Sequence, residues 1–211
     1  MRPIGLKKMK VQKTKSARGE GTRRRIVEQS AAVFNRRGYA GTSMSELMAA
    51  TGLEKGGLYR HFESKEDLAA AAFDYAWETV NEPRRRGIEN CTTAIEKLLL
   101  LVKNFVEQPP RTLPGGCPVL NTAIDSDDGN AVLRGKARAA LDQWRADIAD
   151  IVREGQQSGE LRDEIDPAAV ATVVIAGLEG AVMMSRMERT REPLLMVGKH
   201  LAGYLQSLKA S

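Results

Sequence analysis

The chain has 211 residues and a formal net charge of +5. This length is enough for one large core or two smaller ones without disulfide staples. The two cysteines, Cys91 and Cys117, are too few for a disulfide framework or a four-ligand zinc site, which favours free thiols in a reducing cytosol.

The charge is divided unevenly along the chain. Residues 1–65 carry 15 Lys/Arg against 5 Asp/Glu, whereas residues 66–211 carry 17 against 22. A basic module followed by an acidic remainder indicates that the first part faces a polyanion, and nucleic acid is the leading candidate.

Residues 1–21 are rich in lysine and show no periodic apolar face, so we expect a flexible basic tail. Such a tail either contacts DNA phosphates or a minor groove, or is a solvated end without a role. No apolar stretch of a secretory signal follows the basic start.

From Thr22 onward the apolar residues recur at helical spacing, and no alternating run predicts a strand, which indicates an all-α fold. Ser43 and Glu46 form a capping-box pattern at the start of the second helix, and Gly52 marks the turn after it. The first three helices are expected at about residues 22–37, 44–51 and 55–62.

Six further helices are predicted in the acidic remainder. Ser64 caps the fourth, which Pro83 ends, and the fifth is expected to pack against it. Pro118 opens a short sixth helix, because a proline at the first helical position loses little. The other expected landmarks are a fifth helix at about 93–106 ended by Pro109, a seventh at about 131–158, and an eighth and a ninth starting near Pro167 and Pro193.

Two short helices joined at Gly52 behind a third make a helix-turn-helix, whose second helix enters the major groove. On that helix Leu58 and Phe62 are apolar, while its remaining side chains are polar. Gly56 and Gly57 each cost about 1 kcal/mol relative to alanine inside a helix. They are expected where the backbone approaches DNA closely.

At this point the motifs are specific. Gly38-Tyr39-x-x-Thr42-Ser43, the stretch Thr51-Gly52-Leu53-Glu54-Lys55-Gly56-Gly57-Leu58-Tyr59-Arg60-His61-Phe62, and Ser64-Lys65-Glu66-Asp67-Leu68 resemble the TetR family of bacterial regulators. The matching motifs cover about residues 22–68. The resemblance implies an all-α fold of about nine helices, with a helix-turn-helix domain at 22–66 and a ligand-binding and dimerisation domain at 67–211.

The resemblance also implies roles for single residues. Thr42, Tyr59 and Lys65 would hold phosphates, and the start of the third helix would meet base edges. Packing for Tyr59, a surface or capping role for His61, and solvation for Lys55 and Lys65 are the alternatives. Glu54 stands where the family usually has a serine or threonine cap, and it should point away from DNA. The expected DNA-contacting set is Thr42, Ser43, Lys55, Gly56, Gly57, Tyr59, Arg60, His61 and Lys65.

The eighth helix is apolar nearly all round, and a soluble monomer of this size has little room to bury it. A near-continuous apolar run at 168–187 contains Glu179, which argues against a membrane span. This apolar surface is expected to be buried in a self-complementary interface between two protomers. The resemblance implies that this interface is a four-helix bundle. A core helix within one subunit is the alternative. The expected interface residues are Ala176, Gly177, Gly180, Ala181, Met184, Leu194, Val197, Leu201 and Leu205.

The fourth to eighth helices offer residues for a largely apolar effector pocket with a few orienting polar groups. The candidates are Phe73, Trp77, Asn104, Phe105, Cys117, Asn121, Trp144, Met183 and Met184. Each of them is also a plain core candidate. Cys117 is either a buried inert thiol or a reactive sensor near a helix N-terminus. The acidic turn at 125–130 lacks EF-hand spacing, and we expect no metal or cofactor.

The sequence therefore predicts a cytoplasmic, homodimeric DNA-binding regulator that acts on a near-palindromic operator and is released from it by a small, largely apolar effector. A ligand-independent architectural or adaptor protein is the alternative. An enzyme is not expected, because catalytic motifs are missing and only His61 and His200 are present.

Overall fold

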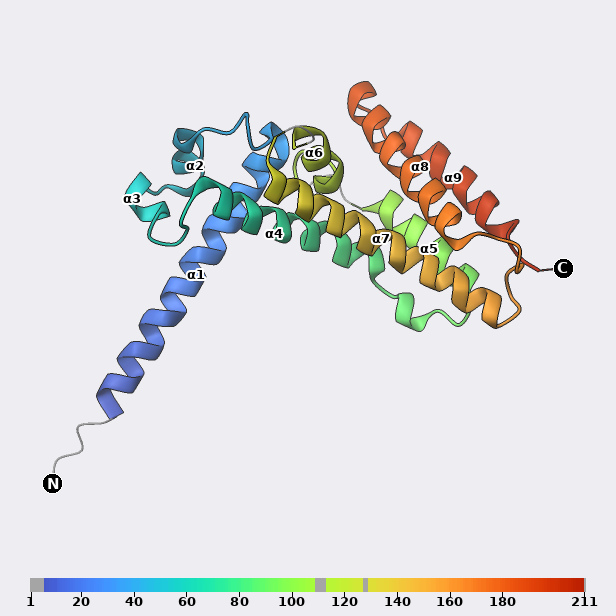
Figure 1. The fold of residues 1–211 in the computed structure, drawn as a ribbon, viewed down its shortest axis with the longest axis horizontal. Coiled ribbons are helices and arrows are strands. Elements are labelled where there is room, and N and C mark those ends of the chain that lie inside the picture. Colours follow the sequence, from blue (N-terminus) through green and yellow to red (C-terminus); the bar gives the residue numbers. More distant parts are fainter. Residues whose placement is uncertain (1–5, 109–112, 127–128, 211) are drawn as a thin grey trace.

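The structure is a computed structural model that describes residues 6–108, 113–126 and 129–210, with side chains from Gly19 onward. In these ranges the chain forms nine α-helices and no strand beyond one isolated bridge, which confirms the all-α prediction (Figure 1). In chain order the helices are α1 (Leu6–Arg37), α2 (Met44–Thr51), α3 (Lys55–Leu58), α4 (Lys65–Arg85), α5 (Ala94–Glu107), α6 (Pro118–Asp125), α7 (Ala131–Gln157), α8 (Pro167–Glu188) and α9 (Glu192–Gln206), with a 3-10 helix η1 (Ile88–Asn90) before α5.

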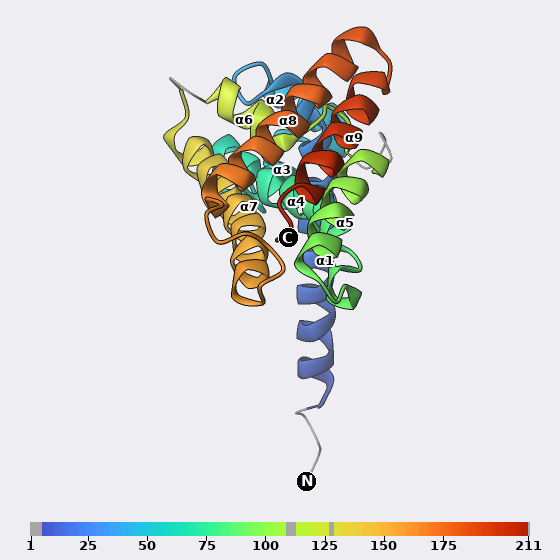
Figure 2. The ribbon, with the colours of Figure 1, turned by 90° about the vertical axis from the view of Figure 1, so that its right-hand side faces the viewer.

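The first helix begins at Leu6 and not near Thr22. The expected flexible tail is therefore helical in its described part, residues 6–21. Lysine, glutamine and arginine are good helix formers, and only Gly19 and Gly21 weaken this stretch. The N-terminal half of α1 extends away from the other helices (Figures 1 and 2). Residues 1–5 of the expected tail lie outside the described residues.

The C-terminal half of α1, together with α2, α3 and the start of α4, forms the head of the molecule. Its buried core is made by Ile26, Val27, Leu47, Leu58, Phe62 and Leu68. Because Leu68 lies on α4, this helix starts inside the head. Further along, Ala76 and Val80 are buried in another cluster. One continuous helix therefore links the head to the rest of the chain, which we call the body.

The body is built from α5, α7, α8 and α9 around one large core, with α4 and α6 beside it (Figure 2). Helices α4 and α5 pack against each other, as the sequence predicts. Helix α7 buries Trp144, Ile148 and Val152 on its inner side. The core of the body is thus separate from that of the head.

Two further helix ends differ from the prediction. Helix α3 stops at Leu58 instead of Phe62, because two of its four residues are glycines with low helix propensity. Helix α4 continues through Pro83 to Arg85. Since Pro83 lies in the last turn, the helix loses only one backbone hydrogen bond there. The predicted stop of α5 at Pro109 lies outside the described residues.

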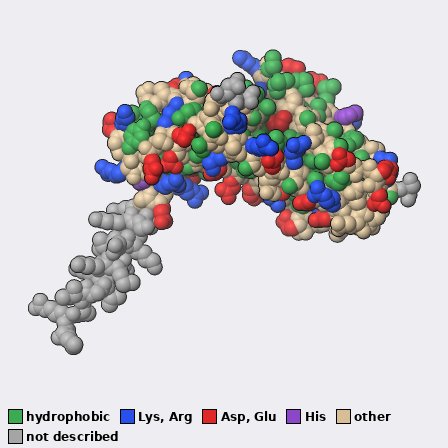
Figure 3. All heavy atoms as spheres, in the orientation of Figure 1, with side chains coloured by type: hydrophobic (Ala, Val, Ile, Leu, Met, Phe, Trp, Pro, Cys, Tyr) green, Lys and Arg blue, Asp and Glu red, His purple; other side chains and the backbone are tan. Residues whose placement is uncertain are grey.

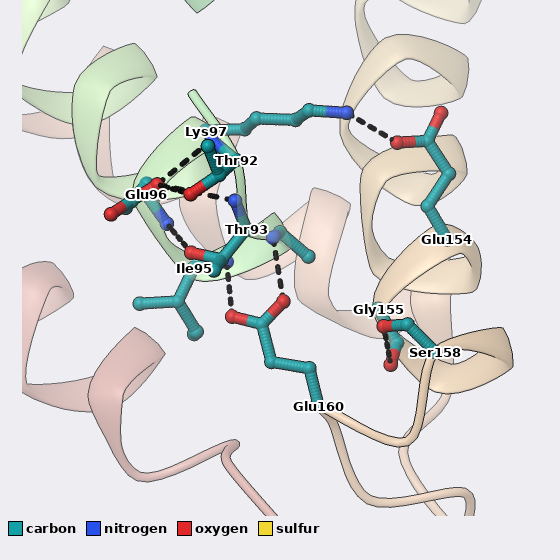
Figure 4. A network of polar contacts seen from close by, with 10 residues as sticks. Thr92, Thr93, Ile95, Glu96, Lys97, Glu154, Gly155, Ser158 and Glu160 are labelled. Carbon is teal, nitrogen blue, oxygen red and sulfur yellow. Dashed lines mark hydrogen bonds and ion pairs between the residues drawn. The ribbon is translucent and has the colours of Figure 1, made fainter. Parts of the chain in front are cut away.

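The N-terminus of α5 is capped from two directions (Figure 4). Thr93 and Glu96 form a capping box, and the carboxylate of Glu160 accepts the backbone N–H groups of Ala94 at 2.7 Å and Ile95 at 3.0 Å. These donors have no partner inside the helix, so the Glu160 carboxylate satisfies them from the loop after α7. The start of α5 is therefore fixed against the end of α7.

The end of the chain is tied to the same loop. Helix α9 ends at Gln206, and Leu208 beyond it is buried. The backbone N–H of Ala210 donates to the Glu160 carbonyl at 2.9 Å, and that of Arg162 donates to the Leu208 carbonyl at 3.2 Å. The last described residues thus belong to the body and close it.

Candidate DNA-binding head, effector cavity and dimer face

Helix α2 is fixed at both ends by local interactions, which sets the direction of α3. The Ser43 hydroxyl accepts the Glu46 backbone N–H, and the Glu46 carboxylate accepts the Ser43 backbone N–H at 2.8 Å. At the other end Gly52 adopts φ +64°, where glycine has no steric penalty. The predicted capping box and turn are confirmed, and α2 and α3 form a helix-turn-helix.

The two sides of α3 and the following turn differ in polarity. Leu58 and Phe62 are buried in the head core. Exposed on the other side are Lys55, Gly56, Tyr59 and Arg60, with Gly57 and His61 half-buried. The Lys55 ammonium lies 5.9 Å from the centroid of the Tyr59 ring. The exposed side therefore offers cations, hydrogen-bond donors and an aromatic ring to a partner.

The glycines of α3 are not required by packing within the protein. A Cβ built on Gly56 would meet no atom within 4 Å, and one on Gly57 would make an ordinary contact with Leu53 at 3.4 Å. Neither glycine has a positive φ. The absence of side chains here therefore leaves the backbone open to something outside this chain.

Two expected phosphate contacts have partners inside the head. Thr42 is buried and its hydroxyl donates to the Gly38 carbonyl at 2.6 Å, so its side chain does not lie on the exposed surface. The Lys65 ammonium donates to the Tyr39 carbonyl at 2.6 Å and lies 4.2 Å from the Tyr39 ring centroid. Burial lowers the pKa of Lys65. An ammonium has three donors, so Lys65 keeps capacity for a phosphate.

The prediction omitted a group of arginines on α1. Arg23, Arg24 and Arg25 are exposed, and the Arg23 guanidinium lies 4.7 Å from the Phe62 ring centroid at the end of the helix-turn-helix. Lys and Arg side chains are visible where α1 leaves the head (Figure 3). The run of three arginines in the sequence is the signal that would have identified them.

The predicted effector residues do not form one group. Asn104 donates to the carbonyls of Arg84 and Arg86 and so caps the end of α4. Met183 and Met184 are exposed on the outside of α8, at 51% and 39%. These three assignments are wrong, because a helical repeat does not show which side of a helix faces a cavity.

The other predicted effector residues lie in two places. Phe73 and Asn121 border a cavity of only about 30 Å³ beneath α1, which has room for little more than a water molecule. Phe105 and Cys117 border a larger cavity of about 440 Å³. The Trp144 ring is stacked on Phe105 at 5.8 Å and tilted against Trp77 at 5.9 Å, but neither tryptophan lines this cavity.

We call the larger space the effector cavity, because it is the candidate site for the predicted effector. It lies between α4, α5, the loop before α6 and the connection from α8 to α9. Its lining residues are Val80, Arg84, Phe105, Gln108, Leu113, Gly115, Gly116, Cys117, Val182, Ser185, Arg186, Arg189, Thr190, Arg191 and Leu194. The volume suits a small-molecule ligand. The expected largely apolar lining is wrong in one respect, because four of these residues are arginines.

The loop that lines the effector cavity is also joined to the head. The Asn35 amide on α1 donates to the carbonyls of Pro114 at 2.9 Å and Gly116 at 3.0 Å. The Asn121 amide on α6 lies within hydrogen-bond distance of the Asn35 carbonyl, at 3.0 Å, and of the Gly115 carbonyl, at 2.8 Å. The cavity wall at residues 114–116 is therefore bonded directly to α1 and α6.

Two titratable groups are buried beside the cavity. Burial and the neighbouring Glu179 raise the pKa of the Cys117 thiol to about 12, so the reactive thiolate is disfavoured. Burial likewise raises the pKa of Glu179, and its two carboxylate oxygens accept no hydrogen bond of normal geometry from the described residues. The Cys117 thiol and the charge of Arg84 lower this pKa by less than burial raises it. The burial and raised pKa of Cys117 therefore support a buried, inert thiol and not a reactive sensor. Among the described residues no His, Cys, Asp or Glu group could hold a metal ion.

The buried Glu179 predicts a pH dependence of stability. Its folded-state pKa lies above the usual 4.5, so the folded protein binds the proton more tightly, and stability falls as pH rises through that pKa. The groups acting on Glu179 are Cys117 and Arg84. Glu179→Gln should therefore unfold at higher urea concentration than wild type at neutral pH, with a smaller loss of stability as the pH rises from 4.5 to neutral.

The matched control for this measurement is Glu188→Gln, which makes the same change at an exposed site on α8. It should leave the pH dependence of unfolding as in wild type, at equal protein concentration. If Glu179→Gln and wild type lose stability in parallel over this range, Glu179 is ionised in the folded protein without cost.

Exposed apolar side chains gather on α8 and α9. Six of the nine large exposed apolar residues of the described chain lie there: Val173, Met183, Met184, Met187, Leu195 and Met196. By length and composition α8 passes the test for a membrane-crossing helix, with 33% of its most apolar window buried in the protein. We call the outer surface of α8 and α9 the dimer face, after the interface that the sequence predicts for these helices.

Only part of the predicted interface lies on the dimer face. Ala176 and Met184 are exposed there, and Gly180 has open space around it. Ala181, Leu201 and Leu205 are buried inside the protomer, so their assignment is wrong. Leu194 and Val197 pack against the body core, and a Cβ on Gly177 would lie 3.5 Å from the side chains of Val197 and Leu201. Gly177 thus serves the contact between α8 and α9.

Two family models match the chain. The model described as "Bacterial regulatory proteins, tetR family" covers residues 26–72, and "Tetracyclin repressor-like, C-terminal domain" covers residues 94–201. The first corresponds to the head with the start of α4. The second runs from the start of α5 into α9.

Individual relatives agree with the family models. The HTH-type transcriptional repressor DhaR of Mycobacterium sp. (strain GP1) is 29% identical over 173 residues, which is 82% of this chain and 86% of that protein. A TetR transcriptional regulator of Chloroflexus aurantiacus J-10-FL shares 48% identity over 92% of this chain and 98% of its own, with a TM-score of 0.86. A cysteine mutant of the TetR family regulator CifR, solved with a 26bp double-strand operator DNA, has the same fold at 24% identity and a TM-score of 0.74, over 84% of this chain and 93% of its own.

Proposed function

Because the chain belongs to the TetR family of bacterial transcriptional regulators, it is a DNA-binding regulator and not an enzyme, and we propose that it is a homodimeric repressor that a small effector releases from its operator. The exposed polar side of α3, with an uncovered glycine, is the observation that carries this proposal. The protein would act in the cytoplasm, on the nucleoid when bound to DNA.

We infer that the start of α3 meets base edges and that the flanking residues hold phosphates. Lys55 reaches a base, while Gly56 and Gly57 let the backbone come close to the groove. The surrounding contacts come from Ser43, Tyr59, Arg60, His61 and Lys65. Because Thr42 is buried with its hydroxyl bonded to Gly38, we leave it out of the contacting set.

The dimer face supports assembly into a homodimer. A soluble protein rarely leaves so many neighbouring apolar side chains in water, and a two-fold contact buries the same surface on both protomers. Two heads in such a dimer would read half-sites about 34–36 Å apart, which predicts a near-palindromic operator. The open space at Gly180 suits close approach of two α8 helices.

Release by an effector is supported by the position of the effector cavity. Its wall at residues 115–117 is bonded to α1 through Asn35 and Asn121, and its other wall includes Arg84 at the end of α4. Both α1 and α4 also form part of the head. A ligand that favours another arrangement of the cavity therefore changes the spacing of the two heads. Operator affinity that no cavity ligand alters would instead support the ligand-independent architectural role.

The DNA-binding surface is tested by Gly56→Ala. The added methyl group meets nothing inside the protein, so the head should gain up to about 1 kcal/mol of stability from helix propensity. On DNA the same methyl group should clash with the groove and weaken operator binding about tenfold or more. Fluorescence anisotropy with an operator selected from random DNA measures the affinity, and urea unfolding measures the stability.

Gly135→Ala on α7 is the matched control, because Gly135 is also exposed, helical and surrounded by open space. It should gain stability without any change in operator affinity. Wild-type affinity in Gly56→Ala would mean that α3 does not approach DNA closely, and the assignment of its glycines would then be wrong.

A further inference from the structure

The effector cavity carries positive charge that the protein itself does not neutralise. Its lining includes Arg84, Arg186, Arg189 and Arg191, and no carboxylate belongs to the described lining. The remaining wall is largely apolar, with Val80, Phe105, Leu113, Val182 and Leu194. A cavity of this kind combines a cationic end with an apolar surface.

Arg84 is the deepest of the four arginines and is only 5% exposed. Its guanidinium carbon lies 4.3 Å from the ring centroid of Phe105 and 4.7 Å from that of Trp144, and Nε donates to Gln108 at 3.4 Å. The buried Nη1 has no partner. A buried cation without an anion is costly, and the planar guanidinium matches the two oxygens of a carboxylate.

Glu179 does not supply that anion. Neither of its oxygens bonds to Arg84, and burial raises its pKa, which favours the neutral acid. The carboxyl group also does not line the cavity. Arg84 therefore has no hydrogen-bonded carboxylate among the described residues, although the charge of Glu179 lies near enough to interact with it.

The three other arginines lie where α8 turns into α9. Arg191 donates to the Val106 carbonyl, which fixes its side chain beside α5. A Cβ on Gly116 would lie 2.7 Å from Nη1 of Arg186, so this guanidinium sits directly against the loop that is bonded to α1. Binding of an anion by Arg186 would thus act on the same loop that joins the cavity to the head.

We propose that the effector is a small organic anion, whose carboxylate is held by Arg84 and the arginines of the α8–α9 turn and whose apolar part lies against Phe105. This inference rests on the proposed function, because it names the chemical class of the effector for the same cavity. The planar guanidinium groups set the orientation of the ligand, and the apolar wall limits the size of its apolar part.

The test uses matched probes with the same carbon skeleton, in which a neutral CH2OH group replaces the carboxylate: octanoate and octanol, phenylacetate and phenylethanol, benzoate and benzyl alcohol. Binding is followed by tryptophan fluorescence, since Trp144 and Trp77 lie 4.7 Å and 5.8 Å from the Arg84 guanidinium carbon. At least one carboxylate should bind about tenfold more tightly than its alcohol. If no carboxylate binds more tightly than its matching alcohol, the proposal is overturned.

Two sets of variants locate the binding. Arg84→Gln should remove about tenfold of the carboxylate affinity and leave the alcohol affinity nearly unchanged. Because Arg84 is buried and its loss can disturb folding, the double variant Arg186→Gln with Arg189→Gln makes the same test at exposed positions. Arg153→Gln on α7 is a control that removes one positive charge outside the cavity, as Arg84→Gln removes one inside it. Equal loss in Arg153→Gln and the double variant would overturn the assignment.

Operator release is measured separately, by anisotropy of labelled operator DNA with the same probes. A carboxylate that binds the cavity with the expected arginine dependence but leaves operator affinity unchanged supports the anion site and contradicts the repressor mechanism. An alcohol that binds more tightly than its carboxylate and still releases operator supports the mechanism and overturns the anion site. The two proposals therefore fail independently.

Discussion

Gly180→Leu is expected to convert the proposed dimer to monomers and, with it, to lose tight operator binding. Within the protomer the new side chain meets nothing, because a Cβ at this position has no atom within 4 Å. Between two α8 helices it fills the space that close approach requires. Overpacking costs about 1–3 kcal/mol at each site, and a two-fold interface contains the site twice. The dimer dissociation constant should therefore rise about 30-fold or more.

Analytical ultracentrifugation over a range of protein concentrations measures this change, and anisotropy measures the loss of operator affinity. Gly135→Leu is the matched control, since it adds the same side chain at an exposed helical glycine of α7 with open space around it. Gly177→Leu should behave differently again, because Val197 and Leu201 lie 3.5 Å from its Cβ position and the body itself would lose stability. A Gly180→Leu protein that remains dimeric at the lowest concentration would remove this part of α8 from the interface.

Gly115→Ala is expected to destabilise the protein by about 3 kcal/mol or more, for two independent reasons. The backbone at Gly115 has φ +110°, a conformation that a side chain strains. The new Cβ would also lie 2.5 Å from the backbone oxygen of Asn35, which belongs to the part of α1 in the head. Neither atom can move aside without shifting the loop or α1. Denaturant unfolding at fixed protein concentration measures the loss.

The chain provides a control that separates the two causes. Gly159→Ala at the end of α7 also has a positive φ, +72°, but its Cβ would meet no atom within 4 Å. It should therefore cost only the backbone strain, about 1–2 kcal/mol. The difference between the two variants measures the close approach of the loop to α1. Equal losses would show that Gly115 is required for its backbone conformation alone.

The head could be predicted from sequence because its signals are local. The box of Ser43 and Glu46 and the left-handed turn at Gly52 are each set by a few neighbouring residues, and the structure confirms them. The start of α1 was not predictable in the same way, since no cap or apolar periodicity marks where the lysine-rich helix begins. The burial of Thr42 was missed because its hydroxyl bonds to a carbonyl four residues back, a choice that sequence does not display.

The body could be predicted as a set of helices but not as a site. The sequence of a helix that is apolar all round, such as α8, does not show which side meets the core. Ala181 and Gly180 were therefore both predicted as interface residues. The effector cavity depends on segments far apart in the chain. Arg84 comes beneath Trp144 and Phe105 through packing of α4 against α5 and α7, whereas Asn104 and Asn121 bond to backbone groups of other elements.

The closure of the body by its last residues has a consequence for the order of events during synthesis. The core of the head is complete once Leu68 has been made. The core of the body includes Leu205 and Leu208, and the Ala210 backbone is bonded to the loop beside the α5 cap. Domains fold as units as they emerge from the ribosome. A nascent chain therefore contains all the residues of the head core while the body core is still incomplete, so the head folds before the body.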